Sequence, residues 1–200
     1  MEVRGAKEAT TYVADFDKVA DFSPMLDACE KAIGSPDRVL IAYGTLPDQA
    51  KAQEDPALAA KALHTNFVSP AVLVESLAGR MKEGSAIAVI TSVAGERGRQ
   101  SNYVYGAAKG GLSRFLEGVR HRLASRKVRV IDVRPGFVDT PMTDGMDKKG
   151  PLWAKPERVA RDIEKALEGK DGPIHTPWFW AIVMAIITRV PARIFHKTKL

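Results

Sequence analysis

Short apolar runs rich in β-branched residues alternate along this chain with longer amphipathic stretches. The apolar runs predict five strands, at residues 9–16, 38–44, 86–92, 128–136 and 172–177. The spacing of apolar residues between them predicts helices at residues 22–33, 56–81, 103–125 and 156–167. This alternation is typical of βαβ units, so we expect an α/β fold with a mostly parallel sheet.

The composition favours a single ordered domain in a reducing compartment. The 200 residues are 45% hydrophobic and 27% charged, and they contain no low-complexity tract. The single cysteine, Cys29, excludes an internal disulfide framework, and the first residues lack the apolar segment of a signal peptide. We therefore expect a cytoplasmic protein.

The positive charge is unevenly distributed along the chain. The formal net charge is +6, yet residues 173–200 contain no Asp or Glu and carry four basic side chains, Arg189, Arg193, Lys197 and Lys199. The adjoining run PWFWAIVMAII is apolar, but its eleven residues fall short of the roughly 20 needed to span a membrane. We interpret residues 177–200 as a segment that contacts the cytoplasmic membrane face peripherally, with a core or homodimer-packing helix as the alternative. Nucleic acid is not expected as a partner.

The run SNYVYGAAKGG places Tyr105 and Lys109 one helical turn apart among glycines and alanines. Residues four apart share a helix face, so the cation should favour the phenolate and lower the tyrosine pKa from about 10. Such a phenol exchanges protons with an alcohol or carbonyl oxygen. The small neighbours would admit a flat ring system or a partner helix. The alternative is an ordinary helix with this common spacing.

Two further residues are candidates for the same site. Ser92 closes a strand thirteen residues before Tyr105, so its hydroxyl and the phenol can converge on one oxygen. Pro70 lacks the N–H that would bond the carbonyl of Asn66 and should kink the helix there. That carbonyl would then be free to hold a water molecule, with a solvated or capping asparagine as the alternative.

The blocks TSVAGERGRQSNYVYGAAKGG and VRVIDVRPGFVDTPM together resemble the active-site region of the short-chain dehydrogenase/reductase family, and the resemblance extends from Asp15 to about Thr176. It implies a Rossmann-like, doubly wound parallel sheet over residues 1–176 and NAD(P)H-dependent reduction of a ketone to a secondary alcohol. In that scheme Tyr105 is the acid/base, Ser92 donates a hydrogen bond to the substrate carbonyl, and Lys109 tunes Tyr105 and holds the nicotinamide ribose.

The same resemblance implies the remaining site residues. Asn66 matches the fourth catalytic position, which holds the water of a proton relay. Thr140 matches the threonine that contacts the nicotinamide carboxamide, and Asp15 and Phe16 match the strand-end pair beside the adenine. The full implied cofactor set is Asp15, Phe16, Gly44, Tyr105, Lys109, Pro135, Gly136, Val138 and Thr140. No metal site is expected.

Within the family, the runs SVAGERGRQSNYVYGAAK, PGFVDTPMT and PARIFHK resemble the reductases of decaprenylphosphoryl-2-keto-ribose, a lipid-linked keto-sugar. Bacterial homologues without an assigned substrate look equally close. The resemblance therefore implies either a small-molecule or a lipid-linked ketone as the substrate.

Two features depart from the family pattern. IAYG stands where most members have Asn-Asn-Ala-Gly, although Gly44 is kept. The family's glycine-rich turn, Thr-Gly-x-x-x-Gly-x-Gly, which holds the cofactor pyrophosphate, has no counterpart. We therefore expect a sheet that lacks the first strand–helix–strand unit. Residues 38–44 should form an open edge that favours aggregation, and residues 9–16 should move in beside it.

These departures leave two hypotheses. In the first, the chain is a shortened nicotinamide-dependent reductase, through a misplaced start or a gene truncation. In the second, it is a non-catalytic remnant or interaction protein that cannot bind cofactor. The intact set of Asn66, Ser92, Tyr105, Lys109 and Thr140 favours the first hypothesis. The missing turn predicts weak or absent NAD(P)H binding, and the choice between NAD and NADP is left open.

Overall fold

The computed structural model describes residues 6–148, 150–169 and 171–198. Four parallel strands form the main sheet in the order β1-β2-β3-β6, namely β1 (Arg38–Ile41), β2 (Ala86–Ile90), β3 (Arg129–Pro135) and β6 (Gly172–Thr176). A small parallel pair, β4 (Phe137–Val138) and β5 (Trp153–Ala154), follows the end of β3. The predicted α/β fold with a parallel sheet is confirmed.

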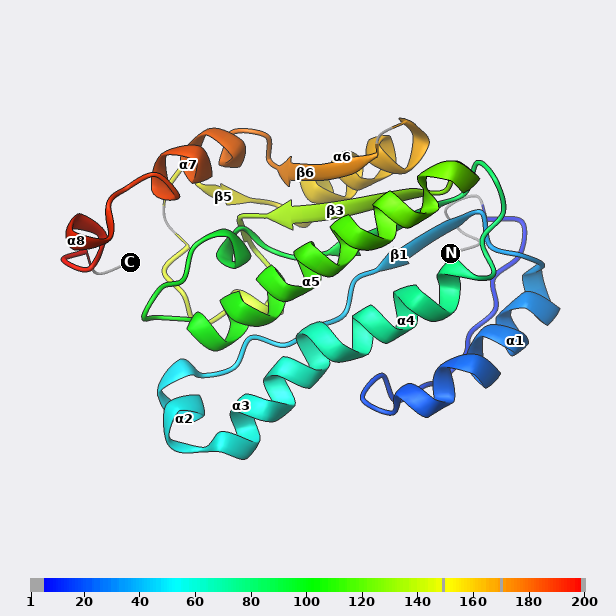
Figure 1. Ribbon diagram of the computed structural model, residues 1–200, viewed down its shortest axis with the longest axis horizontal. Helices are drawn as coiled ribbons and strands as arrows, with labels where there is room; N and C mark the ends of the chain where they lie inside the picture. Colours follow the sequence, from blue (N-terminus) through cyan, green and yellow to red (C-terminus); the bar gives the residue numbers. More distant parts are fainter. Residues whose placement is uncertain (1–5, 149, 170, 199–200) are drawn as a thin grey trace.

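The helices are α1 (Phe22–Ile33), α2 (Gln49–Glu54), α3 (Pro56–Leu63), α4 (Ser69–Ala78), α5 (Tyr103–Leu123), α6 (Pro156–Gly169), α7 (Trp180–Ile187) and α8 (Ala192–Phe195). Figure 1 shows α4 and α5 running side by side along the sheet, with α1 beside α4 and α7 near the end of β6.

The two faces of the sheet are covered unequally. Alternate strand side chains, including Ile41, Ile87 and Val89, pack against α1, α4 and α5 in the larger core cluster. The opposite side chains of β2 and β3, such as Ala88 and Ile131, pack against α6. Leu40 pairs in register with Ala88 but is 47% exposed, and it belongs to neither core cluster of the sheet. The described contact of α6 with β1 is the ion pair of Glu168 with Arg38, at 3.8 Å. A hollow is therefore left along this face of β1.

The predicted strand at residues 9–16 is wrong, because this segment forms no ladder with β1 or any other strand of the described residues. Only its last part packs. Phe16 stacks on Tyr43 with ring centroids 4.4 Å apart, and the Ser69 hydroxyl donates to the Phe16 carbonyl. Within the described part of the chain β1 pairs with β2 alone, so it forms the open edge that the sequence predicts.

The long predicted helix at residues 56–81 is interrupted at Asn66. A π-helical turn, η3 (His64–Val68), joins α3 to α4, and Pro70 follows it at the start of α4. A proline four residues after Asn66 removes one helical donor, and a π turn is a common way to accommodate that loss. The expected local distortion is therefore present, and it lies beside a candidate catalytic residue.

Candidate active site

One cavity of about 610 Å³ opens at the carboxyl ends of β2 and β3 and continues along the uncovered face of β1. Ser92 and Tyr105 both line it, as do Pro135 and Thr140. Parallel α/β sheets place ligands at the carboxyl ends of their strands. The two candidate reacting groups therefore share the position where such a fold binds small molecules.

Ser92 lies where β2 gives way to the short turn η4 (Val93–Glu96). Its Oγ accepts a hydrogen bond from the Ala94 N–H at 3.1 Å, and this contact fixes the orientation of the hydroxyl. A hydroxyl that accepts one bond still has its own proton to donate. Ser92 can therefore donate to Tyr105 or to an oxygen bound in the cavity.

Tyr105 differs from the sequence prediction in its acidity. Burial raises its pKa to about 12, although a hydrogen bond with Ser92 acts in the opposite direction. Desolvation disfavours the phenolate, and here it outweighs the hydrogen bond with Ser92. The prediction that the Tyr105 pKa is lowered is therefore wrong for Tyr105 as the surrounding protein side chains set it. Tyr105 is a protonated phenol at neutral pH, which suits it to donate a proton.

Lys109 is 3% exposed and lies one turn beyond Tyr105 on α5. Its Nζ donates to the Ile90 carbonyl at 2.9 Å and lies 5.8 Å from the centroid of the Tyr105 ring. Burial lowers the Lys109 pKa to about 8, and the negative charge of Asp132 offsets part of that effect. The ammonium form next to the phenol is therefore lost in mildly alkaline solution.

We expect Lys109 to titrate far below an ordinary lysine. Because its pKa is about 8, NMR of side-chain labelled lysine should show one ε-methylene signal with a midpoint near that pH. Asp132→Asn removes the charge that favours the ammonium form, so the midpoint should move to lower pH. A Lys109 signal that keeps an ordinary lysine midpoint, or that moves upward in Asp132→Asn, would contradict this geometry.

Asn66 is fully buried and holds the loop after β1. Its Oδ1 accepts from the Thr45 N–H at 3.0 Å, and its Nδ2 donates to the Ala62 carbonyl at 2.9 Å. A Cβ on Gly44 would lie 2.8 Å from Asn66 Oδ1 and 3.4 Å from Lys109 Nζ. Gly44 therefore leaves room for the Asn66 and Lys109 side chains against the backbone after β1.

The small residues of the YGAAKGG run explain how α5 approaches η4. A Cβ on Gly106 would lie 2.8 Å from the Ala94 carbonyl oxygen, and one on Gly110 would lie 2.7 Å from that of Gly95. Only residues without a Cβ permit such contact. The glycines bring the backbone that carries Ser92 against the helix that carries Tyr105, rather than making room for a ring system.

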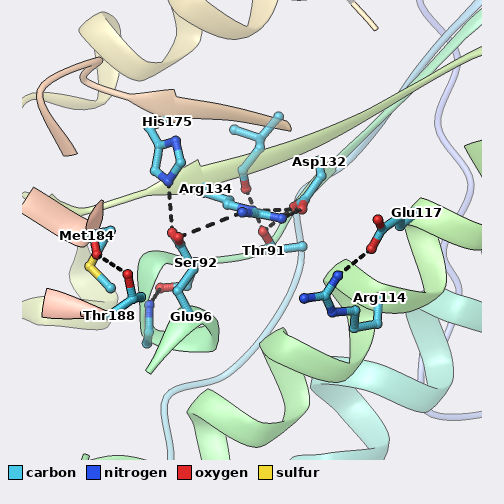
Figure 2. Close-up of polar contacts among 12 residues, drawn as sticks. Thr91, Ser92, Glu96, Arg114, Glu117, Asp132, Arg134, His175, Met184 and Thr188 are labelled. Carbon is cyan, nitrogen blue, oxygen red and sulfur yellow. Dashed lines mark hydrogen bonds and ion pairs between the residues drawn. The ribbon is translucent and has the colours of Figure 1, made fainter. Parts of the chain in front are cut away.

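A chain of charged side chains runs beneath the site (Figure 2). The Asp132 carboxylate, 1% exposed, accepts from the Thr91 hydroxyl at 2.5 Å. It also accepts from Nη2 and Nε of Arg134, at 2.7 and 2.8 Å. Arg134 also lies 3.8 Å from Glu96, whose other oxygen is hydrogen-bonded to His175 at 2.8 Å. These contacts tie η4, β3 and β6 together behind Ser92.

The other predicted cofactor residues divide into two groups. Pro135, Gly136, Val138 and Thr140 line the cavity with Tyr105. The indole of Trp180 covers Gly136, where a Cβ would lie 1.9 Å from the ring. Asp15 and Phe16 are not among the lining residues, and Asp15 contacts Lys18 instead.

A nicotinamide cofactor has two parts that a protein must hold, the nicotinamide half and the pyrophosphate. The residues that line the cavity suit the nicotinamide half. Tyr105, Lys109 and Thr140 supply hydrogen-bonding groups at the carboxyl ends of the strands, where the nicotinamide half would bind. Within residues 6–148, 150–169 and 171–198, no glycine-rich turn leads into a helix to form the usual nest of amides for a pyrophosphate.

The C-terminal segment packs beside the site through α7. Trp180 and Met184 of α7 form a cluster with Val93 of η4. The Arg97 guanidinium donates to the carbonyls of Thr188 and Val190 at 2.9 Å. The apolar composition of residues 177–187 indicated burial or membrane contact, but nothing in it specified η4 as a partner.

The short chain dehydrogenase family model matches residues 2–150. An uncharacterized oxidoreductase of Mycobacterium tuberculosis is 34% identical over 199 residues, which cover 98% of this chain and 80% of that protein. Carbonyl reductase family member 4 of Xenopus tropicalis is 37% identical over 94 residues, 44% of this chain and 40% of that protein.

Solved structures show the same fold. A 3-oxoacyl-[acyl-carrier protein] reductase from Brucella melitensis, in complex with NAD, superposes with a TM-score of 0.75 at 21% identity and covers 87% of this chain and 79% of its own. A putative dehydrogenase from Burkholderia cenocepacia, with bound NADP, gives 0.77 at 15% identity, with 86% and 72% covered.

Proposed function

Because this chain belongs to the short-chain dehydrogenase/reductase family and is an NAD(P)-dependent oxidoreductase of that family, we propose that it reduces a ketone to a secondary alcohol. The observation that carries the proposal is that Ser92 and Tyr105 line one cavity, with Tyr105 protonated at neutral pH and the Lys109 Nζ 5.8 Å from the Tyr105 ring centroid.

The side chains of the protein supply the proton that the reaction requires. A bound reduced nicotinamide cofactor supplies the hydride that adds to the carbonyl carbon. The Ser92 hydroxyl donates a hydrogen bond to the carbonyl oxygen, and the Tyr105 phenol transfers its proton to that oxygen as the alcohol forms. The Lys109 ammonium, 5.8 Å from the Tyr105 ring centroid, then stabilises the phenolate that is left.

The experiment measures the oxidation of NADH and of NADPH in the presence of a panel of ketones. The loss of near-ultraviolet absorbance reports the oxidation. The proposal predicts oxidation that depends on the ketone and that yields the matching alcohol. Oxidation at the same rate without ketone, or no oxidation with either cofactor at millimolar concentration, would contradict it. The second result would favour a non-catalytic interaction protein.

We further propose that the ketone is part of a lipid-linked substrate. The cavity is long and largely apolar, with Leu40, Leu46, Phe137, Met142 and Ile163 among its lining residues. It extends from Ser92 along the uncovered face of β1 as far as Arg38 and Glu168. An apolar chain attached to the ketone would find a matching surface there.

We also propose that residues 177–200 contact an anionic membrane surface. The described part of this segment exposes an apolar stripe at four-residue spacing, with Trp178 64%, Ile182 55% and Ile186 64% exposed. Trp180 and Met184 face the protein instead. An apolar stripe beside basic residues, in a segment without acids, is the pattern of an interfacial helix.

No part of this proposal requires a spanning helix. Among the described residues, the run Pro56–Ala78 has the length and mean hydropathy, 1.2, of a membrane-crossing helix. It includes Val74 and Leu77, which belong to the main core cluster with α5. The α7 region is too short to cross a membrane and would lie on its surface.

We expect replacement of Ile182 and Ile186 together by Asp to abolish flotation with anionic liposomes, because the stripe loses apolar area and gains two negative charges. Replacement of Val13 and Leu63 by Asp, an equal charge change at exposed apolar positions elsewhere, should leave flotation intact. Equal recovery of the two double variants would contradict membrane contact. Membrane contact would also be contradicted if the wild-type protein never bound liposomes and formed a dimer that dissociates in the Ile182 and Ile186 double variant.

A further inference from the structure

The short turn that carries Ser92 is fixed to β3 at both of its ends. Thr91, directly before Ser92, donates its hydroxyl to the Asp132 carboxylate, and Glu96, the last residue of η4, lies 3.8 Å from the Arg134 guanidinium. Asp132 and Arg134 are two residues apart on β3, so their side chains leave the same face of that strand. Arg134 also donates to Asp132 at 2.7 Å. The contacts therefore close a ring around Ser92 (Figure 2).

Glu96 has a second contact that joins the turn to another strand. Its other carboxylate oxygen is hydrogen-bonded to His175 Nε2 at 2.8 Å, so Glu96 connects η4 to β6 as well as to β3. The side chains of Glu96, His175 and Arg134 are all largely buried. Desolvation opposes the attraction within such pairs, so their net contribution to stability is small. The contacts of Glu96 therefore bear more on the position of η4 than on the stability of the whole fold.

The other surfaces that touch η4 give it little direction. On the side of α5, Gly110 lies against the Gly95 backbone and Gly106 against the Ala94 carbonyl. Glycines permit this close approach, but they have no side chain that could interlock with the turn. Val93 packs with apolar side chains of α7, and apolar contact is non-directional. The charged contacts at the end of η4 are therefore the ones that fix the direction of the turn.

Glu96 does not reach the reacting groups itself. It is not among the residues that line the catalytic cavity, and together with Arg134 it lines a separate hollow of about 240 Å³. It lies on the same short turn as Ser92, whose Oγ accepts from the Ala94 N–H of that turn. A shift of η4 would therefore move the Ser92 hydroxyl, and a displacement of about 1 Å can lower turnover by about 100-fold.

We propose that Glu96 is a positioning residue of the reaction, because it holds η4 between β3 and β6 and thereby keeps the Ser92 hydroxyl directed at the substrate carbonyl. His175 and Arg134 act with it as the partners of its carboxylate. The effect of Glu96 on turnover rests on the proposed function. Its effect on the geometry of η4 does not, and the two effects are measured separately.

Amide hydrogen exchange, measured by NMR without cofactor or ketone, tests the effect on η4. The Ala94 N–H is bonded to Ser92 Oγ and the Gly95 N–H to the Ser92 carbonyl, both at 3.1 Å. Glu96→Ala should speed the exchange of these two amides about tenfold or more, as expected when a hydrogen bond to a charged group is lost. The amide of Leu116, in the buried middle of α5, should change by a much smaller factor. Equal acceleration of all three amides would mean general destabilisation and would overturn the proposal.

Three further variants control this measurement. Glu96→Gln keeps a group that can bond to His175 but loses the negative charge, so it should restore part of the protection of Ala94. Glu75→Ala removes a carboxylate that is also held by two contacts, both with Arg122, and it should leave Ala94 exchange unchanged. His175→Phe keeps a ring but removes the contact from the side of β6, so it should resemble Glu96→Ala. If Glu96→Ala does not fold, His175→Phe decides, and wild-type protection of Ala94 in that variant overturns the proposal.

Turnover shows whether the effect of Glu96 reaches the reaction through Ser92. Glu96→Ala should lower kcat for ketone reduction about tenfold or more in the wild-type background. In the Ser92→Ala background it should cause no further loss, because the hydroxyl that it positions is absent. Equal losses of kcat in the two backgrounds would overturn the positioning role.

These outcomes are separate from the fate of the proposed function. Protection of the Ala94 amide that depends on Glu96 would stand even if no ketone were reduced. Conversely, ketone reduction by a protein whose Ala94 exchange and kcat are unaffected by Glu96→Ala would leave the proposed function intact and remove only the positioning role.

Discussion

Tyr105→Phe should lower kcat for ketone reduction by about 100-fold or more, the loss expected when a positioned general acid is removed. The phenol is the group that gives its proton to the carbonyl oxygen, and phenylalanine keeps the ring but has no proton to give. Because burial raises the Tyr105 pKa to about 12, the proton is present throughout the neutral range. The measurement is steady-state kinetics with saturating cofactor and ketone.

Tyr103→Phe is the matched control, since Tyr103 begins the same helix but is 43% exposed. Its turnover should stay close to that of the wild type. A Tyr105→Phe enzyme with full activity, alongside an inactive Tyr103→Phe enzyme, would mean that the other phenol carries the reaction. The urea midpoint should be unchanged in Tyr105→Phe, which separates loss of chemistry from loss of fold.

Gly110→Ala should destabilise the protein by about 1–3 kcal/mol, the range for forced overpacking. The new Cβ would lie 2.7 Å from the backbone oxygen of Gly95, and a backbone atom cannot rotate away as a side chain can. Relief of this contact requires α5 and η4 to separate, which also moves Ser92 away from Tyr105. Both the urea midpoint and the turnover should therefore fall.

Gly118→Ala is the same substitution in the same helix, at a position where the added Cβ meets nothing within 4 Å. Alanine favours helix over glycine, so this variant should gain about 0.5–1 kcal/mol. Opposite signs for the two variants are the expected result of equilibrium urea unfolding. Equal effects would mean that the close approach of α5 to η4 contributes nothing.

Local sequence patterns predict correctly the helices and strands that pack against other secondary structure. The bounds of α1 agree with the apolar periodicity, and β2, β3 and β6 lie within the predicted apolar runs. Residues 9–16 have the composition of a strand, but a strand forms only when another strand pairs with it. The exposed fraction of Val13, 97%, reflects that missing neighbour.

The candidate site was predictable in its residues but not in its electrostatics. The spacing of Ser92, Tyr105 and Lys109 indicates proton chemistry, and all three meet at one end of the sheet. The sequence does not reveal how deeply each group is buried, so the direction of the Tyr105 shift was mispredicted. The pairing of Glu96 with His175 joins residues 79 positions apart, which no local pattern can specify.

The most direct test of the central claim is the transfer of deuterium from a labelled cofactor to the product. The protein is incubated with a ketone and with millimolar NADH or NADPH that carries deuterium on one face or the other of the nicotinamide ring. The high concentration allows a weakly bound cofactor to react. If the site reduces ketones, mass spectrometry should find one deuterium atom on the carbinol carbon of the alcohol, from one face of one cofactor only. An alcohol without deuterium from either face, or no alcohol at all, would contradict the account.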